Sequence, residues 1–212
     1  MVDVGVVRGE DGRRRCGWAL SAPENVVYHD REWGRPVVDD ARIYEKLCLE
    51  GFQSGLSWLT ILRKRDGFRR AFKSFSPEVV ARFGPKDLDR LLADASIVRH
   101  RGKIEATIAN ARATLAAQDR YGSLAAVVWS FEPARRRGAP ARLGDIPSLT
   151  SESTALSKAL RQLGFRFVGA TTVYAAMQSL GVVNDHLAGC SVRASCQAER
   201  RAMTPPVPVA PS

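Results

Sequence analysis

The chain has 212 residues, of which 45% are hydrophobic and 25% charged, enough to build one sizeable core in one or two domains. Its 32 Lys and Arg residues exceed its 22 Asp and Glu residues by ten, which favours a polyanionic partner such as nucleic acid over an inert basic surface. No apolar run reaches the roughly 20 residues that cross a bilayer, and Met1–Arg15 lacks the apolar centre of a signal peptide, so we expect a soluble, cytoplasmic protein.

The first predicted elements are a tail and two helices. Residues 1–14 carry few large apolar side chains and predict a mobile basic tail. Asp39 and Asp40 can cap a helix that runs to about Glu50. The spacing of the leucines that follow predicts that a helix continues over 53–65.

Turn residues mark the later helices. We expect helices that begin near residues 76, 85 and 103, and two more that span residues 153–163 and 170–180. Ser76-Pro77-Glu78 combines a cap, a first-turn proline and a first-turn acid, and Gly164 and Gly181 suit helix C-termini. Alternating strand patterns are scarce, so the predicted fold class is all-α. We expect a helical body over 15–196, with a surface loop around 132–143 and a Pro-rich mobile tail over 197–212.

Two Cys/His pairs lie at opposite ends of this body, Cys16 with His29 and His186 with Cys190. Two thiols and two imidazoles suit a tetrahedral zinc site, and four protein ligands leave no position for water. We therefore predict one structural zinc ion per chain, which would clasp the N- and C-terminal regions. The alternative is a chance scatter of common residues, although two of the three histidines in the chain fall in these pairs.

Aromatic residues gather in the first third of the chain, where Trp18, Tyr28, Trp33 and Trp58 occur. Glu50 lies between the last two of them, in an apolar run beside a glycine. An acid in that setting is either a buried functional group or a helix-end residue that faces solvent, and the sequence pattern favours neither.

Together these stretches resemble the DNA-3-methyladenine glycosylase I family of the helix-hairpin-helix glycosylase superfamily. The segments that carry the resemblance span about residues 15–196 in family order: RCGW (15–18), YHDREWG (28–34), LEGFQSGLSW (49–58), IVRHRGKI (97–104), VWSF (128–131), SKAL (157–160), FRFVG (165–169) and VNDH (183–186). The resemblance implies an all-α helical glycosylase fold with a helix-hairpin-helix DNA-binding motif. It also implies that the four Cys and His residues clasp zinc, and that no cofactor takes part in the chemistry.

The implied activity is hydrolysis of the N-glycosidic bond of 3-methyladenine in alkylated double-stranded DNA, by base flipping and without strand cleavage. Electron-rich rings attract such a cationic base, and we expect Trp18 and Trp58 to stack on it with Trp33 lining the pocket. Glu50 carries over from the family as the acid that binds the base edge and contributes to catalysis. Tyr28 would bind the same base.

The implied DNA-binding motif is a helical hairpin at about 94–103, with His100, Arg101 and Lys103 as candidate DNA contacts. Leu56 is either a wedge that fills the gap left by the flipped base or a core leucine. We expect the protein to act as a monomer.

Two positions depart from the family pattern. Asn25 stands where an aromatic residue is common, which motivates the alternative of a glycosylase with a shifted lesion preference. Ser96 stands where the hairpin often has glycine, so a left-handed backbone there would be strained. A further alternative is a non-catalytic, zinc-stabilised DNA-binding module.

Overall fold

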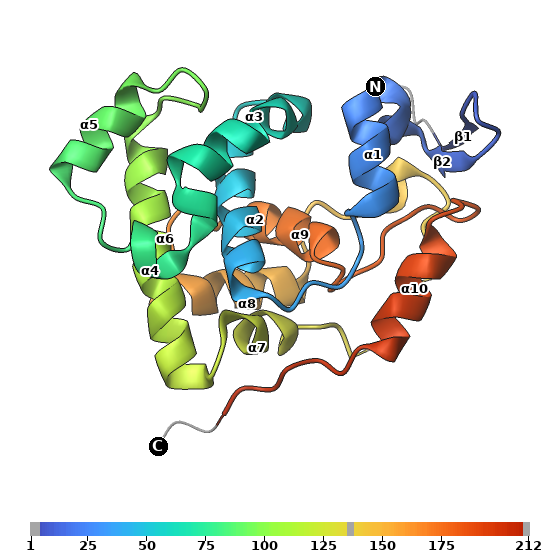
Figure 1. Cartoon of the computed structure of the whole chain (residues 1–212). Coiled ribbons are helices and arrows are strands. Elements are labelled where there is room, and N and C mark those ends of the chain that lie inside the picture. Colours follow the sequence, from blue (N-terminus) through green and yellow to red (C-terminus); the bar gives the residue numbers. More distant parts are fainter. Residues whose placement is uncertain (1–4, 135–137, 210–212) are drawn as a thin grey trace.

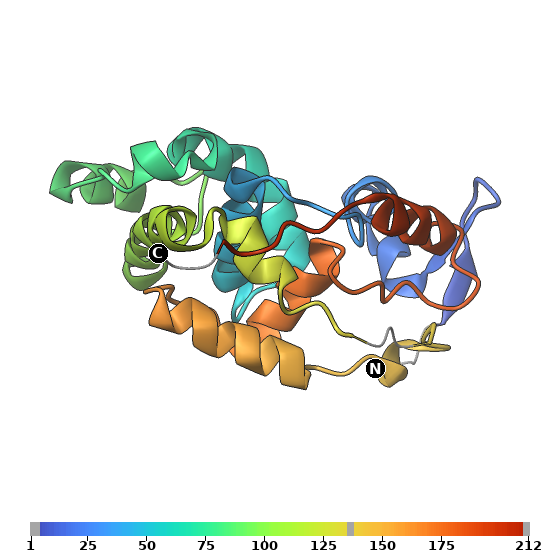
Figure 2. The same cartoon turned by 90° about the horizontal axis from the view of Figure 1, so that it is seen from below.

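The computed structural model describes residues 5–134 and 138–209. Within these ranges the chain forms ten α-helices, three short 3₁₀ helices and one two-stranded hairpin, so the predicted all-α class is confirmed. Figures 1 and 2 show α5 (Pro85–Ala93) and α6 (Arg101–Tyr121) at one side of the molecule, with α1 (Pro23–Arg31), α10 (Arg193–Ala202) and the hairpin at the other. No described helix has the length and apolar character needed to span a membrane.

The helices follow one another along the chain with short connections. Their bounds are α1 (Pro23–Arg31), α2 (Asp40–Gln53), α3 (Trp58–Ala71), α4 (Pro77–Val80), α5 (Pro85–Ala93), α6 (Arg101–Tyr121), α7 (Leu124–Trp129), α8 (Ser151–Gln162), α9 (Ala170–Ser179) and α10 (Arg193–Ala202). The predicted starts at Pro77 and Pro85 are confirmed, as is the long helix α6. Gly164 and Gly181 follow α8 and α9 with positive φ angles of 98° and 72°, as their predicted capping role requires.

The N-terminal segment contains a strand where the sequence predicts a mobile tail. Strand β1 (Val6–Arg8) pairs antiparallel with β2 (Arg14–Cys16), with Val7 opposite Arg15. The Arg15 guanidinium holds the hairpin by ion pairs to Asp11 at 2.6 Å and Asp30 at 2.8 Å. These charge partners could not be inferred from the apolar content of the segment, on which the prediction rested.

The C-terminal boundary also differs from the expectation, because α10 continues to Ala202. Residues 203–209 have no regular structure, and the Val209 amide donates to the Tyr121 carbonyl at 3.2 Å. Residues 1–4 and 210–212 of the two predicted tails, and 135–137 of the predicted loop, lie outside the described residues.

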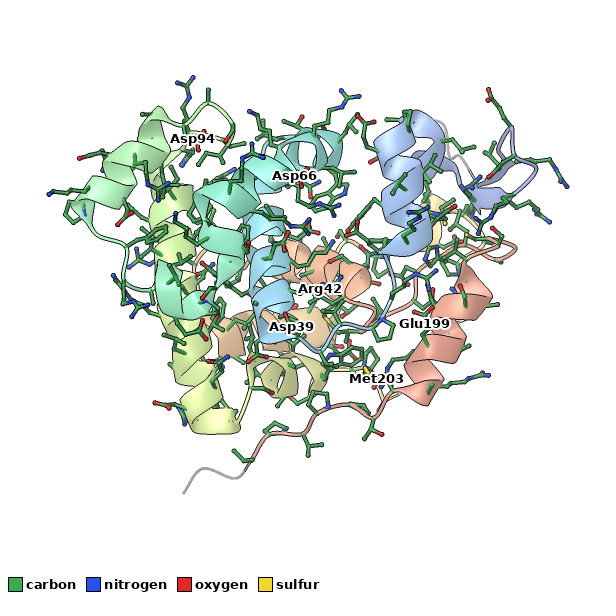
Figure 3. All side chains as sticks on the ribbon, in the orientation of Figure 1. Asp39, Arg42, Asp66, Asp94, Glu199 and Met203 are labelled. Atoms are coloured by element: carbon green, nitrogen blue, oxygen red, sulfur yellow. The ribbon has the colours of Figure 1, made fainter. Side chains whose placement is uncertain are left out.

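The helix predicted over 53–65 is interrupted. Helix α2 begins as expected, with the Asp39 side chain accepting from the Arg42 amide at 2.9 Å (Figure 3), but it ends at Gln53. Gly55 then takes a positive φ of 82°, and Ser57 caps α3 by accepting from the Thr60 amide at 3.2 Å. The leucine spacing is therefore helical only from residue 58, and Leu56 lies in the connection.

Helix α2 runs through the centre of the molecule and contacts α3, α6, α7 and α9. All ten residues from Ile43 to Phe52 are buried, and three of them carry a charge: Glu45, Lys46 and Glu50. Because burying an unpaired charge is costly, these three side chains need partners or a function.

Candidate functional site

Both ends of the fold supply ligand atoms to one buried cluster. Cys16 ends β2 and His29 lies in α1, whereas His186 and Cys190 lie between α9 and α10. Their four ligand atoms lie within 4.8 Å of one another, and all four residues are buried. The structure thus brings the two Cys/His pairs together as predicted, into a group that could hold a metal ion.

The spacing inside the cluster fits a tetrahedral metal site. A tetrahedral zinc ion places its two nitrogen ligands about 3.3 Å apart and each nitrogen about 3.6 Å from each sulfur. Here His29 Nε2 lies 3.2 Å from His186 Nδ1 and 3.5 Å from Cys190 Sγ. His186 Nδ1 lies 3.6 Å from Cys190 Sγ and 3.8 Å from Cys16 Sγ.

The outer hydrogen bonds of the two imidazoles support the same conclusion. His29 Nδ1 lies 2.8 Å from Asp30 Oδ1, and His186 Nε2 lies 3.0 Å from the Trp33 carbonyl. His29 Nδ1 and His186 Nε2 must each carry the hydrogen of these bonds. In the neutral imidazoles, the other two nitrogens, His29 Nε2 and His186 Nδ1, therefore face each other with lone pairs. A bound cation would remove the repulsion between them.

The pocket beside this cluster has a volume of about 340 Å³, within the range of small-molecule sites. All five side chains proposed from the sequence to bind substrate contribute to its wall, together with five that sequence reasoning missed. The lining residues are Trp18, Tyr28, Trp33, Glu50, Trp58, and in addition Gln53, Leu143, Ile146, Ala175 and Gln178. Four of the missed residues come from segments more than 80 residues downstream, and no local pattern marks them. Gln53 is the exception, because it lies on α2 one turn after Glu50 and the i, i+3 spacing could have placed it on the same face.

The aromatic side chains pack edge to face and tilted around the pocket. The rings of Trp18 and Trp33 lie 5.2 Å apart at 81°, and those of Tyr28 and Trp58 lie 5.1 Å apart at 42°. The Trp58 Nε1 donor is buried and has no hydrogen-bond partner among the described residues. A buried donor of this kind is destabilising until an acceptor arrives, which is a property of ligand sites.

Glu50 reaches the pocket from α2, where it is only 6% exposed. Burial raises the pKa of Glu50 to about 7, and the nearby Lys46 ammonium opposes that rise. Within the described ranges its carboxylate accepts no hydrogen bond. Of the two interpretations that the sequence left open, the structure therefore favours the buried acid with unused acceptor capacity.

The Cys/His cluster and the pocket share two indoles. The Trp33 ring lies 4.6 Å from the His186 ring, and the Trp18 ring lies 5.4 Å from the His29 ring. Both indoles also line the pocket. The cluster therefore fixes one wall of the pocket in place.

The candidate DNA contacts fall into two groups. His100 and Arg101 are exposed at the start of α6, where His100 Nδ1 accepts from the Lys103 amide at 3.3 Å. Lys103 is buried instead, and its ammonium donates to the carbonyls of Phe52 at 2.9 Å and Ser54 at 2.6 Å. Its side chain therefore holds the end of α2 and does not reach the surface.

Leu56 is 42% exposed in the connection that Lys103 holds, so it is not the core leucine that the sequence left open. This geometry is compatible with a wedge, because the side chain is apolar, solvent-facing and mounted on an anchored turn.

The two departures from the family pattern behave differently in the fold. Ser96 has no positive φ, so the predicted strain is wrong; its amide donates to Asp94 Oδ1 at 2.8 Å, in the turn beside Asp94 (Figure 3). Gly67 accommodates this turn, since a Cβ there would lie 2.5 Å from the Ser96 carbonyl oxygen.

Asn25 is buried on α1 and does not line the pocket, and its Oδ1 lacks a partner among the described residues.

Comparison with known proteins gives consistent matches over most of the chain. The family described as methyladenine glycosylase matches residues 18–194. The chain is 48% identical over 177 residues to DNA-3-methyladenine glycosylase 1 of Escherichia coli (strain K12), covering 83% of this chain and 95% of that protein.

Solved structures agree with these sequence matches. A crystal structure of 3-methyladenine DNA glycosylase I superposes with a TM-score of 0.79 at 46% identity, over 84% of this chain and 98% of the other. A variant of 3-methyladenine DNA glycosylase I in complex with 3-methyladenine superposes with a TM-score of 0.81 at 34% identity, over 84% and 97% of the two chains.

Proposed function

Because the chain belongs to the methyladenine glycosylase family, we propose that it is a DNA repair enzyme that hydrolyses the N-glycosidic bond of 3-methyladenine in alkylated DNA. The observation that carries this proposal is the pocket itself, which combines four aromatic side chains with one carboxylate that has no hydrogen-bond partner in the described structure. The relatives named 3-methyladenine DNA glycosylase I include one solved with that base.

The chemistry of the lesion explains the composition of the pocket. Methylation at N3 makes the base cationic in DNA and weakens its bond to the sugar, so the leaving group needs no strong acid. Each ring face attracts a cation by about 0.5–2 kcal/mol. Trp18 and Trp58 would stack on the base, with Trp33 forming the wall that adjoins the metal cluster.

Glu50 and Tyr28 would recognise the base by hydrogen bonds to its edge. An ionised Glu50 accepts from the exocyclic amino group, and its negative charge favours a cationic base over a neutral one. Removal of this carboxylate would lower both affinity and rate. Tyr28 would bind the same base through its hydroxyl.

Water is the expected nucleophile. None of the ten side chains that line the pocket is a lysine, which supports a monofunctional enzyme that releases the base without cutting the strand.

The nucleotide must leave the duplex to reach this pocket, at a cost of a few kcal/mol that is smaller at a damaged base pair. We propose that double-stranded DNA lies against the α5–α6 hairpin, with the α6 N-terminus, His100 and Arg101 at a phosphate. Leu56 would fill the gap in the stack. The buried Lys103 would support the Leu56 turn and make no contact with phosphate.

The metal that we propose for the Cys16, His29, His186 and Cys190 cluster is one structural zinc ion per chain. Four protein ligands complete its coordination, so the ion supplies stability and no reactive water. The monomeric state and the cytoplasmic location expected from the sequence stay predictions.

Base release from methylated duplex DNA, followed by chromatography of the free bases, tests this function. We expect 3-methyladenine as the product, with the rate falling by at least about tenfold in Glu50→Gln and in Trp58→Ala. Asp66→Asn is a matched control, because this carboxylate is exposed on α3, with 85% of its side chain accessible (Figure 3).

The same experiment separates the alternatives. Duplex binding without any base release would replace the enzyme with a zinc-stabilised DNA-binding module. Preferential release of 3-methylguanine would indicate a shifted lesion preference, the alternative that Asn25 motivated because it stands where an aromatic residue is common, although Asn25 does not line the pocket.

A further inference from the structure

Lys46 is a buried cation directly behind the aromatic wall of the pocket. It lies on α2, one turn before Glu50, and is only 6% exposed. Its ammonium donates to the Tyr28 hydroxyl at 3.1 Å. The same atom lies 4.3 Å from the centre of the Tyr28 ring and 5.5 Å from that of Trp58. A lysine this deeply buried is rare in proteins unless it is paired.

The charges around Lys46 come from three parts of the fold: Glu32 after α1, Glu45 and Glu50 on α2, and Arg65 on α3. Two of the acids already have an arginine partner. Glu32 receives two hydrogen bonds from Arg65, at 2.6 and 2.8 Å, and Glu45 receives one from the α3 residue Arg69 at 2.8 Å.

Glu50 is the remaining acid of this group, and it is the one that lines the pocket. Its charge is opposed by burial and supported by Lys46. Burial likewise lowers the pKa of Lys46 to about 8, and the charges of Glu32 and then Glu50 oppose that fall, so the Lys46 ammonium and the Glu50 carboxylate each favour the charged form of the other. Glu50 without Lys46 would take up a proton and lose its capacity to accept from the base on both oxygens.

We propose that Lys46 is a positioning residue of the pocket, whose ammonium keeps Glu50 ionised and fixes the Tyr28 hydroxyl for recognition of the base. Lys46 acts through these two side chains, because it is not among the residues that line the pocket. A base can therefore contact the carboxylate while the ammonium stays behind the Tyr28 ring. The part that concerns the base rests on the proposed function, whereas the ionisation of Glu50 does not.

The ionisation of Glu50 can be measured in the free protein by carbon-13 NMR of labelled glutamate side chains, with Glu50→Gln identifying the resonance. We expect the Glu50 midpoint to move upward by about one pH unit or more in Lys46→Met and Lys46→Gln. Lys46→Arg, which keeps the charge, should stay closer to the wild type. An unchanged midpoint in the folded neutral variants would overturn the proposal.

Binding of free 3-methyladenine as a function of pH supplies the second readout. In Lys46→Met we expect about tenfold weaker binding at pH 7 that recovers as the pH rises, because the carboxylate then forms without help. Lys46→Gln retains a donor for Tyr28, so it separates the hydrogen bond from the charge. A loss of affinity that is equal at every pH would assign Lys46 a packing role and contradict the inference.

Failure of the proposed function has a different signature. A wild-type protein that neither binds nor releases 3-methyladenine would remove the proposed substrate, yet the Glu50 midpoints would still decide the role of Lys46. Thermal unfolding of each variant checks that it folds. If Lys46→Met does not fold, the comparison of Lys46→Arg with Lys46→Gln still tests the proposal.

Discussion

The His186 imidazole donates from Nε2 to the backbone carbonyl of Trp33 at 3.0 Å, while its Nδ1 points into the Cys/His cluster. One side chain thus joins a ligand position to a wall of the pocket. Because Trp33 follows α1 and His186 follows α9, the contact ties together segments more than 150 residues apart. If the cluster holds the proposed zinc ion, loss of that ion should therefore disturb the pocket as well as the fold.

Replacement of a ligand tests this coupling. We expect wild-type protein to contain about one zinc per chain, and Cys190→Ala to lose it together with about 3 kcal/mol or more of unfolding free energy, or roughly 6–12 °C in melting temperature. Cys48→Ala is the matched control, since this buried thiol on α2 lies outside the four-residue group and its side chain contacts Asn110 instead. Metal analysis and calorimetry give the result, and a metal-free protein of undiminished stability would reject a structural ion.

The pH dependence of base release should report Glu50. Its pKa is raised to about 7, so the carboxylate is present above that pH and disappears below it. We expect kcat/KM to fall on the acid side with a midpoint near pH 7. In Glu50→Gln the residual activity should lose this acid limb, and an acid limb that persists in the variant would assign the titration to another group.

Arg101 and Lys103 are close in sequence, and the fold separates their roles. Arg101→Ala should weaken duplex binding and reduce the slope of log affinity against log salt by about 1. Lys103→Met should leave the salt slope unchanged and destabilise the protein, because the carbonyls of Phe52 and Ser54 lose their donor. Arg201→Ala, exposed on α10 at the other side of the molecule (Figure 1), controls for net charge. Equal salt slopes in the Arg101 variant and the wild type would remove this residue from the DNA interface.

Leu56→Ala separates a wedge from a packing residue. Since the side chain is 42% exposed, we expect a change in melting temperature of no more than about 2 °C. Base release from duplex DNA should slow by about tenfold or more, with a smaller effect on single-stranded methylated DNA, where no stack must be filled. Equal effects on the two substrates would argue against the wedge.

The sequence alone determined the features that depend on short-range chemistry. Ser76-Pro77 and Pro85 mark helix starts, and Gly164 and Gly181 mark helix ends, because each acts on backbone groups within four residues. The Cys/His cluster was also predictable, since few residue types bind zinc and the chain holds only three histidines.

The tertiary structure alone decided which way the ambiguous side chains face. Lys103 turns inward because carbonyls at the end of α2, about 50 residues earlier, accept hydrogen bonds from it. Leu56 turns outward because Gly55 follows the end of α2 and Ser57 begins α3.

Lys46 occurs in an unremarkable helical stretch, and its position behind Tyr28 and beside Glu50 follows from the packing of α1 and α3 around α2. Burial and charge pairing are set by groups distant in the chain, so no local pattern encodes them.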